Sequence, residues 1–190
     1  MLKREIMSPL VSNVNNALSA LVVLAQALIV ALVLAKIFAG RDNKILNFIR
    51  ENALGAALIV ALTATLGSLF YSELAHFTPC KLCWYQRILM YPQVILLGIA
   101  WWKEDWGVRK YAIAMSALGA LIAAFHYFEQ LSAKPLLSCD TTGFSASCSE
   151  RFVTTFGYIT IPMMALSAFL LILVLVMAPI GASRSPNTRD

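Results

Sequence analysis

The chain has 190 residues, of which 59% are hydrophobic and only 13% are charged. A soluble domain of this length carries roughly 25% charged residues, so we expect a single domain embedded in a membrane and in contact with lipid. The 15 Lys and Arg residues, which give a net charge of +5, are scattered between apolar runs. They form no basic face, and this excludes nucleic acid as the expected partner.

Five stretches of the chain are long and apolar enough to cross a hydrocarbon core of about 30 Å as helices. None of them alternates apolar and polar residues as the strands of a membrane barrel do. The predicted fold is therefore all-α and integral to the membrane, a four-helix transmembrane bundle with an additional N-terminal transmembrane helix. The five predicted spans are residues 17–38, 53–71, 84–102, 111–128 and 159–180.

The same pattern predicts how the chain is divided. We expect an accessory helix with a cytoplasmic loop in residues 1–50, the four-helix membrane domain in residues 51–182, and a disordered tail in residues 183–190. A cleaved signal peptide is the alternative for the first span. The apolar run of the first span, about 22 residues, is longer than the 7–15 residues of the apolar core of a signal peptide, which favours a membrane span.

The positive charges predict the orientation of the spans. Four Lys and Arg residues lie at the end of the first span or in the loop after it (Lys36, Arg41, Lys44 and Arg50), three lie between the third and fourth spans, and two follow the fifth. These nine fall on one side of the membrane, whereas five fall on the other side and Arg87 lies within the third span. Because cytoplasmic loops carry the excess of positive charge, we predict a multi-pass protein of a bacterial-type plasma membrane. Its N-terminus and its cysteine-containing loops then face outward.

The four cysteines form two close pairs outside the apolar core of the spans. Cys80 and Cys83 make a C-x-x-C at the outer start of the third span, and eight residues separate Cys139 from Cys148 in the long polar loop of residues 130–158. Such pairs indicate redox chemistry, a disulfide staple or a metal site. The wide second pair does not match the spacing of structural zinc sites, so we expect no metal.

The position of the first pair favours redox chemistry. Unpaired N–H groups and a partial positive charge at a helix N-terminus stabilise a thiolate, and a C-x-x-C is typical of dithiols that cycle. Arg87 lies four residues after Cys83, so both side chains project from one helical face. An ionisable residue within a span indicates a functional site. The alternative is that Arg87 only extends its guanidinium to the membrane interface.

Two segments resemble the DsbB family of disulfide bond formation proteins, and most closely its BdbC branch. They are "PCKLCWYQRILMYP" and "CSERFVTTFGYITIP", and the resemblance covers about residues 53–180. It implies a thiol–quinone oxidoreductase, with either ubiquinone or menaquinone as the electron acceptor. The implied partner is an extracytoplasmic dithiol oxidase of thioredoxin fold, similar to DsbA or BdbD. The usual family core has four spans, so the N-terminal span of this chain is a departure from it.

The resemblance also implies a role for each site residue. Cys139 and Cys148 would exchange electrons with the partner, and Cys80 and Cys83 would pass them to the quinone, with Cys83 nearest the ring. Arg87 would lie beside the quinone. His126, near the outer end of the fourth span, is a further candidate because quinone reduction takes up protons and histidine titrates near neutral pH. An interfacial histidine without a catalytic role is the alternative.

Two other kinds of protein remain as alternatives. A quinone reductase of the vitamin K epoxide reductase type shares the chemistry, but its loop cysteines precede the C-x-x-C, whereas here they follow it. A non-catalytic membrane subunit stapled by two disulfides would need the same four cysteines.

Overall fold

The computed structural model of the chain describes residues 9–38, 48–49, 51–132 and 148–177, and in these ranges the fold is helical. The described part holds no β-strand, only an isolated bridge between Thr155 and Ile159. The elements, in chain order, are α1 (Pro9–Phe38), α3 (Ala53–Leu69), the π-helical turn η2 (Phe70–Leu74), α4 (Lys81–Lys103), the 3-10 turn η3 (Trp106–Val108), α5 (Arg109–Leu131) and α6 (Ile161–Val176).

Each of the five predicted spans coincides with a long helix, and the differences lie at the ends. The helix α4 begins three residues earlier than predicted because Cys80 caps it. The backbone of Cys80 is extended, and its sulfur accepts the backbone N–H of Cys83 at 3.4 Å. At the other end Glu104 adopts the left-handed conformation with φ of 53° and closes the helix through the carbonyl of Ala100. The predicted tail, residues 183–190, lies outside the described residues.

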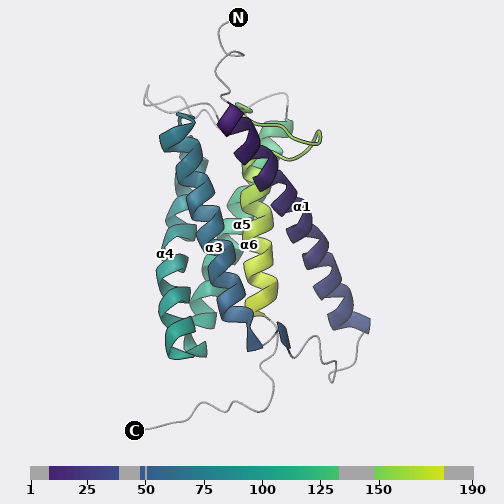
Figure 1. Cartoon of the computed structure of the whole chain (residues 1–190), viewed down its shortest axis with the longest axis vertical. Helices are drawn as coiled ribbons and strands as arrows, with labels where there is room; N and C mark the ends of the chain where they lie inside the picture. The colour runs from purple at the N-terminus through teal and green to yellow at the C-terminus, as the bar shows by residue number, and fades with distance from the viewer. Residues whose placement is uncertain (1–8, 39–47, 50, 133–147, 178–190) are drawn as a thin grey trace, which may run out of the picture.

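Helices α3, α4, α5 and α6 form a bundle in which α5 packs on α6, α4 packs on both α3 and α5, and α3 also packs on α6. Gly119 of α5 allows a close approach to α6, since a Cβ at this position would lie 2.3 Å from the buried ring of Phe169. The additional helix α1 lies at the edge of the bundle and packs against α6 (Figure 1).

The apolar character of the helices confirms an all-α membrane bundle. Three stretches of the described chain are long and apolar enough to cross a membrane, namely Pro9–Ala35, Ala53–Leu74 and Trp106–Leu131, and Ile161–Val176 is a shorter apolar helix. Helix α4 is 23 residues long but contains Gln86, Arg87 and Gln93, which make it less apolar. The protein is therefore a multi-pass membrane protein.

The start of α1 lies at the same end of the bundle as the C-x-x-C and the loop that leads into α6 (Figure 1). A hydrogen bond of 2.8 Å from Asn15 Nδ2 to Thr155 Oγ1 joins the first turns of α1 to that loop. The first turns of α1 therefore lie at the end of the bundle that carries the C-x-x-C.

Candidate functional site

The first cysteine pair is a reduced dithiol at the N-terminal end of α4. Cys80 and Cys83 are free thiols with their sulfurs 3.0 Å apart, which is hydrogen-bonding distance and longer than a disulfide bond. Cys80 is buried, with 3% of its surface exposed, and Cys83 is partly buried. Two contacts lower the pKa of the Cys80 thiol well below its ordinary value. The hydrogen bond with the Cys83 thiol has the larger effect and the contact with His126 the smaller one, whereas burial raises the pKa.

His126 contacts this dithiol from α5. Its Nε2 lies 3.5 Å from the Cys80 sulfur, and its Nδ1 lies 3.0 Å from Nε2 of Gln86. An amide nitrogen can only donate, so Nδ1 of His126 accepts from Gln86 and Nε2 is the nitrogen that carries a proton toward Cys80. That proton points to Cys80 and stabilises the thiolate. His126 has only 2% of its surface exposed.

The loop that follows Cys148 is fastened to the outer end of α5. Gln130 Nε2 donates to the carbonyl of Glu150 at 3.0 Å, and Arg151 Nε donates to the carbonyl of Gln130 at 2.9 Å. Cys148 is disulfide-bonded and has 1% of its surface exposed. It is buried in the same small cluster as Cys80 and Leu82, so the loop brings a disulfide-bonded cysteine into the neighbourhood of the first pair.

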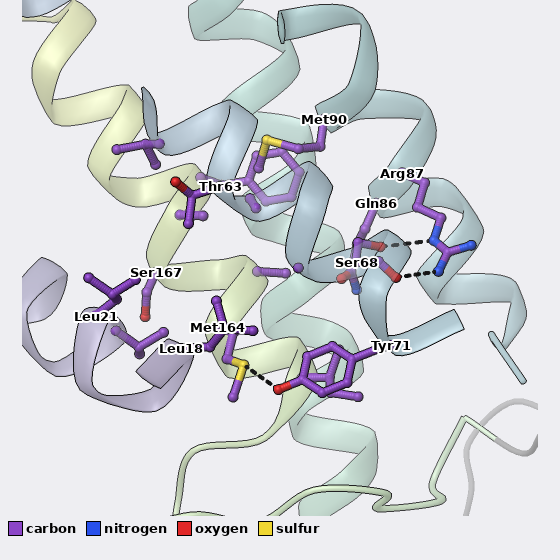
Figure 2. Close-up of a pocket in the computed structure, with 18 of the residues that line it drawn as sticks. Leu18, Leu21, Thr63, Ser68, Tyr71, Gln86, Arg87, Met90, Met164 and Ser167 are labelled. Atoms are coloured by element: carbon purple, nitrogen blue, oxygen red, sulfur yellow. Dashed lines mark hydrogen bonds between the residues drawn. The ribbon is translucent and has the colours of Figure 1, made fainter. Parts of the chain in front are cut away.

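Arg87 of α4 is held by hydrogen bonds to α3. Its Nε donates to the hydroxyl of Ser68 and one terminal nitrogen donates to the carbonyl of Ser68, each at 3.0 Å (Figure 2). The guanidinium also lies 5.2 Å from the ring centroid of Trp84, a favourable cation–π distance. Two parallel hydrogen bonds fix the planar group, which a lysine could not reproduce.

A large apolar cavity opens beside these residues. Its volume is about 360 Å³, within the range of small-molecule pockets. Cys83, Gln86 and Arg87 line it from α4, and Ser68 and Tyr71 line it from α3 and η2 (Figure 2). The remaining walls are almost entirely aliphatic or aromatic. Arg87, Gln86 and Ser68 thus lie together on one side of the cavity, and Thr63 and Ser167 add hydroxyl groups across from them (Figure 2).

Stacked aromatic rings close the cavity at the loop end. The ring of Phe77 stacks on that of Tyr71 with centroids 5.9 Å apart and on that of Phe152 with centroids 5.0 Å apart. All three residues line the cavity. Since Phe152 lies four residues after Cys148, the stack joins the loop to the segment that precedes the C-x-x-C.

A second, much smaller cavity of about 20 Å³ lies on the other side of the dithiol. Cys80, Cys83, His126, Gln130 and Glu150 are among the residues that line it. A space of this size holds about one water molecule. Cys83 therefore borders both cavities, whereas Cys80 and His126 border only the small one.

The structure brings together five of the six predicted site residues. Cys80, Cys83 and His126 are in mutual contact, with their possible ligand atoms all within 4.8 Å of one another. Cys148 belongs to the same buried cluster as Cys80, and Arg87 shares the large cavity with Cys83. The sixth, Cys139, lies outside the described residues.

Sequence reasoning missed two residues that position the others. Gln86 fixes the tautomer of His126, and its place inside the run "CWYQR" beside Arg87 was an available signal. Ser68 holds Arg87 from a different helix, and no pattern in the sequence pointed to it. Both contacts join helices whose relative placement is not evident from spacing along the chain.

These features define a class: a helical membrane protein with a dithiol between a cysteine-bearing polar loop and an apolar cavity. The sequence profile described as "Disulfide bond formation protein DsbB" matches residues 50–179. The chain belongs to this family, in its BdbC branch, and is an oxidoreductase of disulfide bond formation.

The curated relatives agree with this assignment. "Disulfide bond formation protein C" of Bacillus subtilis is 48% identical over 124 residues, which cover 63% of this chain and 86% of the relative. "Probable disulfide formation protein C 1" of Bacillus anthracis is 41% identical over 135 residues, covering 71% of this chain and 93% of the relative. "Probable disulfide formation protein" of Deinococcus radiodurans is 41% identical over 137 residues, covering 68% of this chain and 90% of the relative. No solved structure matches the chain.

Proposed function

We propose that this protein is a thiol–quinone oxidoreductase that re-oxidises an extracytoplasmic dithiol oxidase of thioredoxin fold. The observation that carries the proposal is the position of the first cysteine pair. Cys80 belongs to the same small buried cluster as the disulfide-bonded Cys148 of the loop, and Cys83 lines a large apolar cavity. A dithiol with one sulfur toward each side is suited to receive electrons from a protein disulfide and to pass them to an apolar acceptor.

The electron transfer is balanced in three exchanges. The partner's dithiol is oxidised to a disulfide as the Cys139–Cys148 disulfide is reduced to a dithiol. The loop dithiol then reduces the Cys80–Cys83 disulfide by thiol–disulfide exchange, for which a thiolate must reach the attacked sulfur. Finally Cys80 and Cys83 form their disulfide again and give up two electrons and the proton of the Cys83 thiol to the acceptor, whose second proton comes from water.

The residues around the large cavity fit a membrane quinone. Such a quinone accepts two electrons and two protons in a ring that carries a long apolar tail, and its solubility confines it to the bilayer. The volume and the aliphatic walls of the cavity suit an apolar ring and the beginning of a tail. The polar side formed by Arg87, Gln86 and Ser68 offers donors to the ring oxygens.

The charged and titratable side chains have separate roles in this proposal. Arg87 would stabilise the negative charge that develops on the acceptor as Cys83 gives up its electrons. His126 holds Cys80 as a thiolate through Nε2–H, so that the proton released on oxidation need not come from Cys80. The extracytoplasmic location of the cysteines, predicted from the distribution of positive charge, places the loop where a folded partner can dock.

The test uses purified protein in lipid nanodiscs with a reduced thioredoxin-fold partner, and follows quinone absorbance. We expect continuous quinone reduction, its loss in Cys83→Ser, and near-normal rates in Tyr85→Phe, a change on an exposed part of the same helix. If the wild-type protein reduces no quinone while reduction of its cysteines only lowers its thermal stability, it is a stapled membrane subunit and the proposal is wrong.

A further inference from the structure

Helix α1 stands outside the region that the family profile matches, which begins at residue 50. It is nevertheless an integral part of the fold. Most of its surface faces away from the protein, but Val11, Asn15, Ser19, Val22 and Leu32 are buried against the bundle. Helix α1 is therefore an additional helix with one face packed on the four-helix core.

Specific hydrogen bonds fasten α1 to the bundle at two levels. Tyr71 donates through its hydroxyl to Asn15 Oδ1 at 3.0 Å, near the loop end of the helix. Eleven residues further along, Gln26 Nε2 donates to Ser167 Oγ of α6 at 3.0 Å. A polar side chain in an apolar helix is costly unless it finds a partner inside the protein. These pairs therefore fix both the position and the rotation of α1.

The fixed rotation turns one face of α1 into a wall of the large cavity. Six consecutive positions of that face line it, from Leu18, which contacts Gly67 of α3, to Leu28. Ten residues of helix correspond to a length of about 15 Å. Figure 2 shows Leu18 and Leu21 on the side of the cavity opposite Gln86 and Arg87. The α1 residues that line the cavity are Leu18, Leu21, Val22, Leu24, Ala25 and Leu28.

Residues of α3 and α6 form further walls of the cavity, which are largely apolar but include Thr63 and Ser167. Helix α3 contributes Ile59, Val60 and Thr63, and α6 contributes Ala168 and Leu171. The cavity thus extends from the polar group at Cys83 and Arg87 into a slot between α1, α3 and α6. An apolar ring would occupy only the end near Cys83, and the slot remains for an extended aliphatic chain.

We propose that α1 forms the tail-binding wall of the acceptor site, with the isoprenoid tail of the quinone lying along its face from Leu18 to Leu28. This inference rests on the proposed function and adds the part of the chain that recognises the tail. Helix α1 then discriminates among quinones by their tails, whereas the ring is bound by the four-helix core.

The first measurement does not depend on turnover. Wild-type protein in nanodiscs is irradiated with a quinone that carries a photoreactive group in its tail, and the labelled peptide is identified by mass spectrometry. We expect labelling within residues 18–28, and suppression of it by excess unmodified long-tailed quinone. Suppression by phospholipid alone would identify the slot as a lipid site, and labelling only outside α1 would place the tail elsewhere. Either result overturns the proposal.

A matched pair of substitutions on α1 provides the second measurement. Ala25 lines the cavity, whereas Ala27, two residues further on, is exposed and does not line it. Ala25→Phe fills the slot, and we expect the ratio of KM for a long-tailed quinone to KM for a tailless one to rise about tenfold. Ala27→Phe should leave that ratio and the photolabelling as in the wild type.

The outcomes also separate this inference from the proposed function. If the wild-type dithiol fails to reduce even the tailless quinone, the proposed function is wrong. If the tailless quinone is reduced but Ala25→Phe and Ala27→Phe give the same KM ratio, only the role of α1 is wrong. Thermal unfolding of both variants without quinone confirms that each is folded.

Discussion

Replacement of His126 tests whether the protein holds Cys80 as a thiolate. The Nε2–H of His126 points to the Cys80 sulfur at 3.5 Å, and His126→Phe removes this donor while it keeps a ring of similar size. A hydrogen bond to a charged group contributes about 1.5–3 kcal/mol. Because a pKa change of one corresponds to about 1.4 kcal/mol, the pKa of Cys80 should rise by about one to two.

The direction of the pH effect follows from the contacts. In the wild type the pKa of Cys80 lies well below its ordinary value, first through Cys83 and then through His126. The thiolate therefore persists as the pH falls. Without His126 the midpoint of Cys80 alkylation moves to higher pH, and the rate at mildly acidic pH falls. The hydrogen bond with Cys83 remains, so the shift is partial.

The assay measures alkylation of Cys80 by iodoacetamide as a function of pH, with peptide mass spectrometry to distinguish Cys80 from Cys83. Cys139→Ser and Cys148→Ser in the same chain remove the loop thiols. His76→Asn is the control because His76 is exposed and its positive φ of 54° suits asparagine. If His126→Phe leaves the alkylation profile unchanged, the histidine does not stabilise the thiolate and its assigned tautomer is wrong.

Three further predictions concern the arginine, the helix packing and the topology. Arg87→Lys should lower quinone turnover by about tenfold or more because it loses the two bonds to Ser68, and a wild-type rate would reduce Arg87 to an interfacial residue. Gly119→Ala should destabilise the bundle by about 1–3 kcal/mol through its clash with Phe169, measured by thermal unfolding, and Phe169→Leu should restore part of the loss. A cysteine introduced at Asn43 should resist an impermeant thiol reagent in intact cells, whereas the reduced loop cysteines should react. The reverse labelling would place the site in the cytosol.

The sequence predicted the helices well because hydrophobic length along the chain determines them. The five apolar stretches coincide with α1, α3, α4, α5 and α6, and the i, i+4 spacing correctly anticipated that Cys83 and Arg87 share a face, since both line the large cavity. The residue at which α4 begins was less predictable. Its first turn depends on the Cys80 cap, which hydropathy does not report.

The contacts between helices could not be predicted from one sequence. His126 was expected near the quinone, but it borders the small cavity with Cys80 and not the large one, and its role remains a proposal. Ser68 holds Arg87 only because α3 and α4 pack in a particular register. The position of α1 depends on Asn15 and Gln26 finding partners in the bundle, and spacing along the chain does not reveal these partners.

The central claim is that the two cysteine pairs perform different half-reactions, and single-turnover kinetics on paired variants test it most directly. Partner oxidation and quinone absorbance are followed separately after rapid mixing. Cys139→Ala with Cys148→Ala should abolish oxidation of the partner, while the chemically reduced Cys80–Cys83 dithiol still reduces quinone. Cys83→Ala should lose quinone reduction but accept one round of electrons from the partner. If the variant without loop cysteines still oxidises its partner through repeated turnovers, the C-x-x-C acts alone and the relay is contradicted.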